Sequence, residues 1–89
     1  MKVTYSRKFE KQLKKAPLEI LEALRKRRKL FTEDQFHPQL NNHSLTGKFK
    51  GYRSINITGD WRAIYSQTEN DEEITIIFEM IGTHSQLYK

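Results

Sequence analysis

Cysteine is absent from the 89 residues, which excludes disulfides, thiolate metal ligands and cysteine nucleophiles and leaves the redox compartment open. No apolar run approaches the roughly 18 residues of a membrane span, and the N-terminal MKVTYSRKF lacks the apolar core of a signal peptide. We therefore expect a cytoplasmic protein that makes no membrane contact. The length allows a single domain, over residues 1–89, with a modest hydrophobic core.

Negative charge is scarce in the first half of the chain, which makes that half strongly basic. Residues 1–50 hold thirteen Lys or Arg against five Asp or Glu, a net charge of +8, whereas residues 51–89 hold three against six, a net charge of −3. The basic half is the predicted surface for a polyanion. Its densest run, over residues 25–29, is either a solvated helix face or, through Arg27 and Arg28, a contact to phosphates.

The first half of the chain has the apolar spacing of one strand and two helices. Residues 2–5 have strand spacing, and the Ser6 hydroxyl can cap the helix that follows. Pro17 breaks this first helix and suits the first turn of a second one, which its apolar stripe places at about residues 18–31. We expect the two helices to form a hairpin with one apolar side.

In the second half, apolar and polar residues alternate with the period of two that is typical of strands. This pattern predicts strands over residues 54–58, 61–68 and 74–81. A three-residue turn at 58–60 would place Ile55 opposite Ala63 on the helix-covered side, with Asn56 and Arg62 on the other face. The expected fold is α+β: a helical hairpin on one face of an antiparallel sheet of about four strands. The other sheet face is then free for a ligand.

The second half also carries a series of motifs in a fixed order: His43, Leu45 and Gly47, then Gly51-Tyr52-Arg53, Gly59-Asp60-Trp61 and Gly82-Thr83-His84. This order resembles the YafQ branch of the RelE/ParE toxin superfamily, small bacterial toxins that cut mRNA on the ribosome. The resemblance implies a RelE-like fold and the toxin of a type II toxin–antitoxin system, acting as an mRNA interferase. It further implies a cognate antitoxin as partner, contacts to the ribosome and mRNA, no cofactor, and a monomer that becomes a hetero-oligomer with its antitoxin.

RNA carries its own nucleophile, the 2′-hydroxyl, so its cleavage needs only proton transfer and charge stabilisation by the protein. Histidine can hold or release a proton near neutral pH. In YafQ-like toxins, the active site is formed by the residues that match His43, Asp60, His84 and Tyr88 of this sequence. A second family histidine falls on Asn56, whose amide can hydrogen-bond a phosphate or ribose but cannot shuttle a proton.

These candidates divide into acid–base and phosphate-binding groups. Either Asp60 or His43 is the base that acts on the 2′-hydroxyl, and His84 is the acid. The side chains expected to hold the phosphate or RNA, with Asn56 orienting it, are Lys48, Lys50, Arg53 and Arg62. Each also has an ordinary structural interpretation, such as a turn former or a solvated charge.

Three other functions remain open from the sequence. A ParE-like relative would share the fold and bind DNA gyrase, although such a protein has no need for the histidines and aspartate. A toxin with an impaired site would serve as a regulatory partner of its antitoxin, and an orphan RNA-binding domain would only bind.

Overall fold

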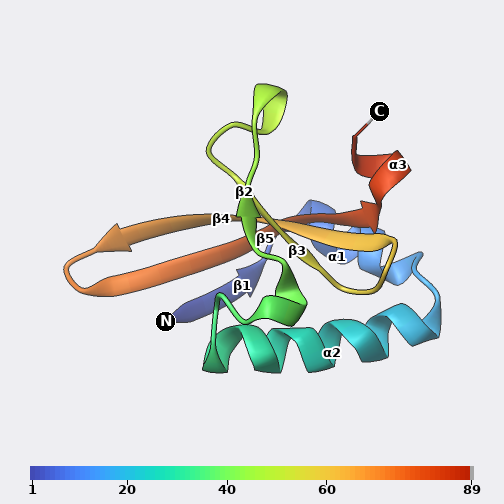
Figure 1. The fold of residues 1–89 in the computed structure, drawn as a ribbon, viewed down its shortest axis with the longest axis horizontal. Helices are drawn as coiled ribbons and strands as arrows, with labels where there is room; N and C mark the ends of the chain where they lie inside the picture. The colour runs from blue at the N-terminus through green and yellow to red at the C-terminus, as the bar shows by residue number, and fades with distance from the viewer. Residues whose placement is uncertain (89) are drawn as a thin grey trace.

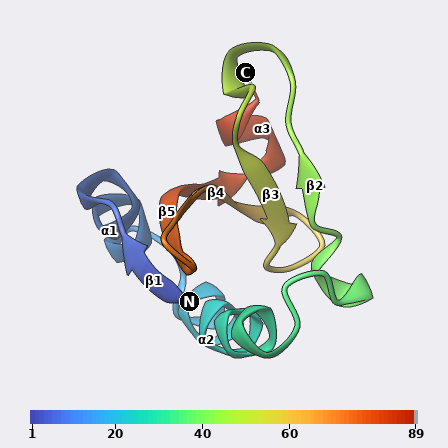
Figure 2. The same ribbon diagram turned by 90° about the vertical axis from the view of Figure 1, so that its left-hand side faces the viewer.

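The computed structural model describes residues 1–88, in which helices cover one face of a five-stranded sheet (Figure 1). The elements are β1 (Lys2–Tyr5), α1 (Arg7–Lys14), α2 (Leu18–Glu33), η1 (Pro38–Leu40), β2 (His43–Ser44), η2 (Gly47–Phe49), β3 (Arg53–Asn56), β4 (Trp61–Asn70), β5 (Glu73–Thr83) and α3 (His84–Leu87), where η marks a 3₁₀ helix. Figures 1 and 2 place α2 and α3 on opposite sides of the β4–β5 pair. The α+β class is therefore confirmed.

The sheet has the order β1-β5-β4-β3-β2 and is mixed. β1 pairs parallel to β5, whereas the other neighbouring strands are antiparallel. The expectation of an antiparallel sheet of about four strands needs correction on both points. Both helices and three strands separate β1 from β5, a connection long enough for parallel pairing, while β2 has only two residues and shows no period of its own.

Local signals in the sequence position the two long helices. Ser6 caps α1, since its Oγ accepts a hydrogen bond from the Phe9 N–H at 3.0 Å and donates one to the Glu79 carbonyl at 2.9 Å. Pro17 directly precedes α2, which runs two residues beyond its expected end. No helix within residues 1–88 is long and apolar enough to cross a membrane.

An aromatic cluster joins both helices to the sheet. Phe78 on β5 lies with its ring centroid 6.0 Å from Tyr5, 5.8 Å from Phe9, 5.5 Å from Phe31 and 5.6 Å from Tyr65. All of these rings except Tyr5 are completely buried. Aromatic pairs at such separations add about 0.5–1.5 kcal/mol each to the free energy of burying their surface.

The strand register separates a helix-covered face from a second face. Ile55 pairs with Ala63, which pairs with Ile81, and all three belong to the helix-side core. Asn56 pairs with Arg62 on the other face, and the Ile57 N–H donates to the Trp61 carbonyl at 2.8 Å across the turn. The register predicted from a three-residue turn is thus confirmed.

The second face of the sheet is only partly free, contrary to the expectation. On it, Ser54 lies opposite Ile64, and both side chains are completely buried. α3 folds back over this face, because a Cβ added to Gly82 would lie 3.4 Å from Leu87 Cδ2. The expectation failed because four residues after β5 form a helix whose Leu87 is buried.

We predict that Phe78→Ala lowers the free energy of unfolding by about 3–5 kcal/mol, because it removes the ring that four aromatic neighbours share. Urea unfolding followed by circular dichroism measures this loss. Leu18→Ala is the matched control: Leu18 is 70% exposed, so its truncation should change stability by less than about 0.5 kcal/mol. Equal effects of the two variants would contradict the role assigned to the cluster.

Candidate active site

A cleft of about 390 Å³ lies on the second face of the sheet. Its walls come from β2 and the segment after it, from β4 and from α3, with lining residues Asn41, His43, Ser44, Leu45, Thr46, Arg62, His84 and Tyr88. The fold therefore brings four of the predicted site residues into one cleft, although they lie up to 45 positions apart in the chain.

His43 projects from β2 towards this face, because it pairs with Ser54, which lies on the same face as Ile64. Its Nδ1 lies 2.8 Å from the carbonyl oxygen of Asn41. A carbonyl oxygen only accepts, so Nδ1 must carry the proton. In the neutral ring, Nε2 is then the unprotonated nitrogen and can accept a proton from a bound molecule.

His84 is fixed at the first position of α3. Its backbone N–H donates to the Asp60 carbonyl at 3.0 Å. A reciprocal pair of bonds between Thr83 and Gln86 caps the helix, at 2.9 and 3.2 Å. The imidazole packs against the Tyr88 ring one turn later, with ring centroids 4.7 Å apart. Two backbone constraints and one stacking contact thus set the position of the imidazole.

Tyr88 connects the two walls of the cleft. Its ring meets Phe49 of η2 edge to face, at 5.8 Å between centroids and an interplanar angle of 87°. This contact ties η2, which follows β2, to the residue directly after α3. Tyr88 therefore holds together the elements that carry His43 and His84.

Arg62 supplies the positive charge of the cleft. Its Nη1 donates to the carbonyls of Thr58 and Gly59 at 3.2 and 3.0 Å, so the β3–β4 turn holds the guanidinium. Beside it, Asn56 Oδ1 is buried without a hydrogen-bond partner among residues 1–88, and so is Ser54 Oγ. Unpaired buried polar atoms are costly. Neither Ser54 nor Asn56 lines the cleft, so these two atoms lie outside its walls.

Asp60 and the two predicted lysines lie next to the cleft rather than in its walls. Asp60 is exposed in the β3–β4 turn, where its backbone carbonyl, not its carboxylate, contacts His84. Lys48 and Lys50 are exposed on and directly after η2, and Lys48 Nζ lies 5.2 Å from the centre of the Phe49 ring.

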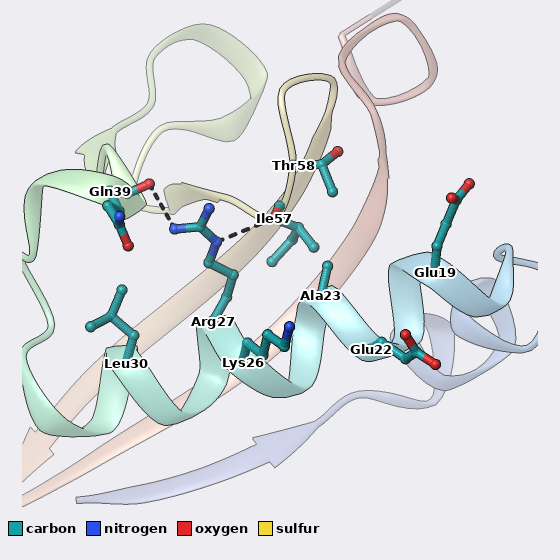
Figure 3. A pocket seen from close by; sticks show the side chains of 9 residues that line it. All are labelled: Glu19, Glu22, Ala23, Lys26, Arg27, Leu30, Gln39, Ile57 and Thr58. Carbon is teal, nitrogen blue, oxygen red and sulfur yellow. Dashed lines mark hydrogen bonds between the residues drawn. The ribbon is translucent and has the colours of Figure 1, made fainter.

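Arg27 and Arg28 belong to α2. Figures 1 and 2 show α2 on the opposite side of the β4–β5 pair from α3, which carries the cleft residue His84. Arg27 Nε donates to the Ile57 carbonyl and its Nη1 to the Gln39 carbonyl, both at 3.3 Å (Figure 3). Arg28 lies 5.2 Å from the centre of the Tyr5 ring. These two arginines therefore do not line the cleft with the histidines. Arg27 instead links α2 to the β3–β4 turn.

Arg53 is also outside the cleft. It pairs with Tyr65, on the sheet face opposite to that of Asn56. Its Nε donates to Asn42 Oδ1 at 2.8 Å, and its guanidinium lies 5.3 Å from the centre of the Phe36 ring. The prediction that Arg53 and Arg62 act on one phosphate is not supported by this placement.

Four cleft residues, Asn41, Ser44, Leu45 and Thr46, were not among the predicted ones. Asn41 has φ = 46°, in the left-handed region that asparagine tolerates better than most residues. The Asn41-Asn42 pair directly before His43 was the available signal for this turn. Within residues 1–88, no three His, Asp or Glu side chains lie close enough together to hold a metal ion.

The comparisons with known proteins agree with this architecture. A YoeB/ParE toxin from Agrobacterium tumefaciens superposes with a TM-score of 0.75 over 94% of this chain and 99% of that one, at 17% identity, so the fold is that of these toxins. A family model described as "Bacterial toxin of type II toxin-antitoxin system, YafQ" matches residues 1–89. The chain belongs to this YafQ toxin family.

Individual relatives come from Escherichia coli. The crystal structure of YafQ from strain BL21(DE3) has a TM-score of 0.80 at 26% identity, over 98% of this chain and 97% of that one. YafQ in the DinJ-YafQ complex gives 0.74 at the same identity and coverage. The "mRNA interferase toxin YafQ" of strain K12 is 38% identical over 47 residues, 53% of this chain. That match spans 47% of the relative, about half its length.

We predict that Gly82→Val displaces α3 and with it His84. The Cβ would lie 3.0 Å from Gln86 Oε1 and 3.4 Å from Leu87, and the two further methyl groups of valine have no room. Nuclear Overhauser contacts between the His84 and Tyr88 rings should disappear. Gly59→Ala is the control, since its Cβ meets nothing within 4 Å. Unchanged ring contacts in Gly82→Val would show that α3 does not depend on this close approach.

Proposed function

We propose that this protein is a toxin that cuts mRNA on the ribosome, held in check by a cognate antitoxin. The observation that carries the proposal is the convergence of His43, His84 and Arg62 on one cleft. These are the proton acceptor, proton donor and positive charge that cleavage by the 2′-hydroxyl requires. The naming of a relative as an mRNA interferase, and the DinJ-YafQ complex, support the activity and the partner.

His43 is the proposed general base. Its hydrogen bond to Asn41 leaves Nε2 free to take the proton of the 2′-hydroxyl. The 2′-oxygen then attacks the adjacent phosphorus, and the bond from phosphorus to the 5′-oxygen breaks. Of the two base candidates from the sequence, His43 is favoured over Asp60 because only His43 lines the cleft.

His84 is the proposed general acid. In its protonated form it gives a proton to the departing 5′-oxygen, so that the products are a 2′,3′-cyclic phosphate and a 5′-hydroxyl. The bond from its backbone to Asp60 and the packing against Tyr88 restrict its ring to one place, which lowers the entropy cost of reaching the transition state.

Arg62 is proposed to neutralise the charge that grows on the phosphorus oxygens. Asn56, where the family has a histidine, pairs with Arg62 across the sheet and is proposed to orient the substrate through this neighbour. Lys48 and Lys50 are proposed to attract the RNA backbone at the rim of the cleft. The exposed cations of α2, including Arg28, are proposed to contact ribosomal RNA from the other side. The proposed site of action is therefore the cytoplasm.

We predict that His43→Gln and His84→Gln each lower kcat by about 10²- to 10⁴-fold, the usual contribution of one positioned acid or base. Glutamine retains hydrogen bonding without a titrating proton. Asp60→Asn should stay within a few-fold of wild type, because His84 contacts the Asp60 backbone rather than its carboxylate. His37→Gln, the third histidine, is the matched control outside the cleft.

Cleavage of a defined message in a purified translation system measures these rates, with and without ribosomes. Antitoxin binding, followed by titration calorimetry, should be the same for every variant and shows that each one folds. Near wild-type cleavage by His84→Gln would remove the general acid from the mechanism. A large loss in Asp60→Asn with none in His43→Gln would transfer the base role to Asp60.

A further inference from the structure

A second cleft, of about 370 Å³, adjoins the first at the edge of the sheet. Phe36 lies in its wall and is 61% exposed, in the loop that follows α2. The guanidinium of Arg53 lies 5.3 Å from the centre of this ring, at a distance typical of a cation–π contact. Tyr52 and the polar side chain of Gln67 also line the cleft. An aromatic face, a cation, a hydrogen-bonding amide and the carboxylate of Glu69 thus surround one space.

The two clefts share one lining residue, Ser44. Ser44 follows His43 directly, and successive residues of a strand point to opposite faces. β2 is therefore the ridge between the clefts, with the histidine on one side and Arg53, the pairing partner of Ser44, on the other. An RNA strand bound at His43 would reach the second cleft by crossing β2, the edge strand of the sheet.

A buried hydrogen-bond network holds this second cleft in shape. Arg53 Nε donates to Asn42 Oδ1 at 2.8 Å, and Asn42 Nδ2 donates to the Tyr65 hydroxyl at 2.8 Å and to the Gln35 carbonyl at 3.0 Å. Gln35, next to Phe36, also donates to the Tyr65 hydroxyl at 3.0 Å. The Phe36 loop is consequently anchored to a completely buried tyrosine, so that binding there costs little ordering.

From these observations we propose that Phe36 and Arg53 form a base-binding subsite for a nucleotide that flanks the cleaved bond. The inference rests on the proposed function and names how the substrate strand continues beyond the catalytic cleft. The base stacks on the Phe36 ring, while Arg53 attracts the phosphate and Gln67 can hydrogen-bond the edge of the base. Stacking on aromatic rings is the common way in which proteins hold unpaired RNA bases.

A segment of a partner protein is the other occupant to consider for this surface. The remaining large apolar side chains that are exposed within residues 1–88, Met1, Leu18 and Leu21, belong to the N-terminus and the first turns of α2. Phe36 thus has no apolar neighbours of the kind that protein interfaces gather at their centre. A single ring beside a cation fits a single base better.

Phe36→Ala tests the subsite. It should raise KM for cleavage of ribosome-bound message by about 5- to 150-fold and leave kcat within about twofold, since one base–aromatic stack is lost without change at the histidines. Phe36→Trp should restore KM, because indole offers a larger stacking face. Leu18→Ala, equally exposed but distant from both clefts, should match wild type.

A binding measurement separates this inference from the proposed function. A single-stranded RNA hexamer that carries 2-aminopurine should lose fluorescence on binding wild-type protein or His84→Gln, and Phe36→Ala should abolish that quenching. This result would support the subsite even if the wild-type protein failed to cut messages. A failure to cut would reject only the proposed nuclease activity. Unchanged KM and quenching in Phe36→Ala would overturn the subsite. Weaker antitoxin binding as the sole effect would also overturn it, in favour of a protein partner.

Discussion

The pairing of β4 with β5 is the constraint on which both faces of the molecule depend. The register from Trp61 opposite Thr83 to Ile64 opposite Met80 directs Ala63 into the core. The same register places Arg62 opposite Gly82 at the cleft. A bulge after Ile64 shifts the pairing by one residue for the rest of the two strands, which ends with Asn70 opposite Glu73. Because side chains alternate along a strand, a slip of one residue would exchange the two faces and destroy core and cleft together.

The two histidines of the cleft are held mainly by backbone contacts, while the helix-covered face provides stability. The Asp60 carbonyl holds the His84 N–H, and the Asn41 carbonyl sets which nitrogen of His43 carries the proton. Carbonyls cannot titrate, so these two constraints persist as the imidazoles gain and lose protons. Aromatic packing around Phe78 lies on the opposite side of the sheet, so the core does not depend on the side chains that line the cleft.

Alternation of apolar residues predicted the register of Ile55 and Asn56, because one side of a strand is buried against helices. Arg53 is in phase with Ile55 and therefore lies on the helix side, away from Arg62, with which it was expected to share one phosphate. The family resemblance identified His43 and His84, whereas spacing alone did not. Two kinds of contact cannot be predicted from the pattern of side chains. One is a contact made by backbone atoms, such as the Asp60 carbonyl, and the other is the long-range hydrogen bond from Arg27 to the Ile57 carbonyl.

Sequencing of 5′-hydroxyl RNA ends after induced expression in bacteria tests the central claim most directly. If His43 and His84 cut message on the ribosome, new 5′-hydroxyl ends should accumulate inside translated regions and should be missing from untranslated RNA. Blocking translation initiation should remove them. Intact messages accompanied by an SOS response would contradict the account and indicate a toxin that acts on DNA gyrase through the same fold.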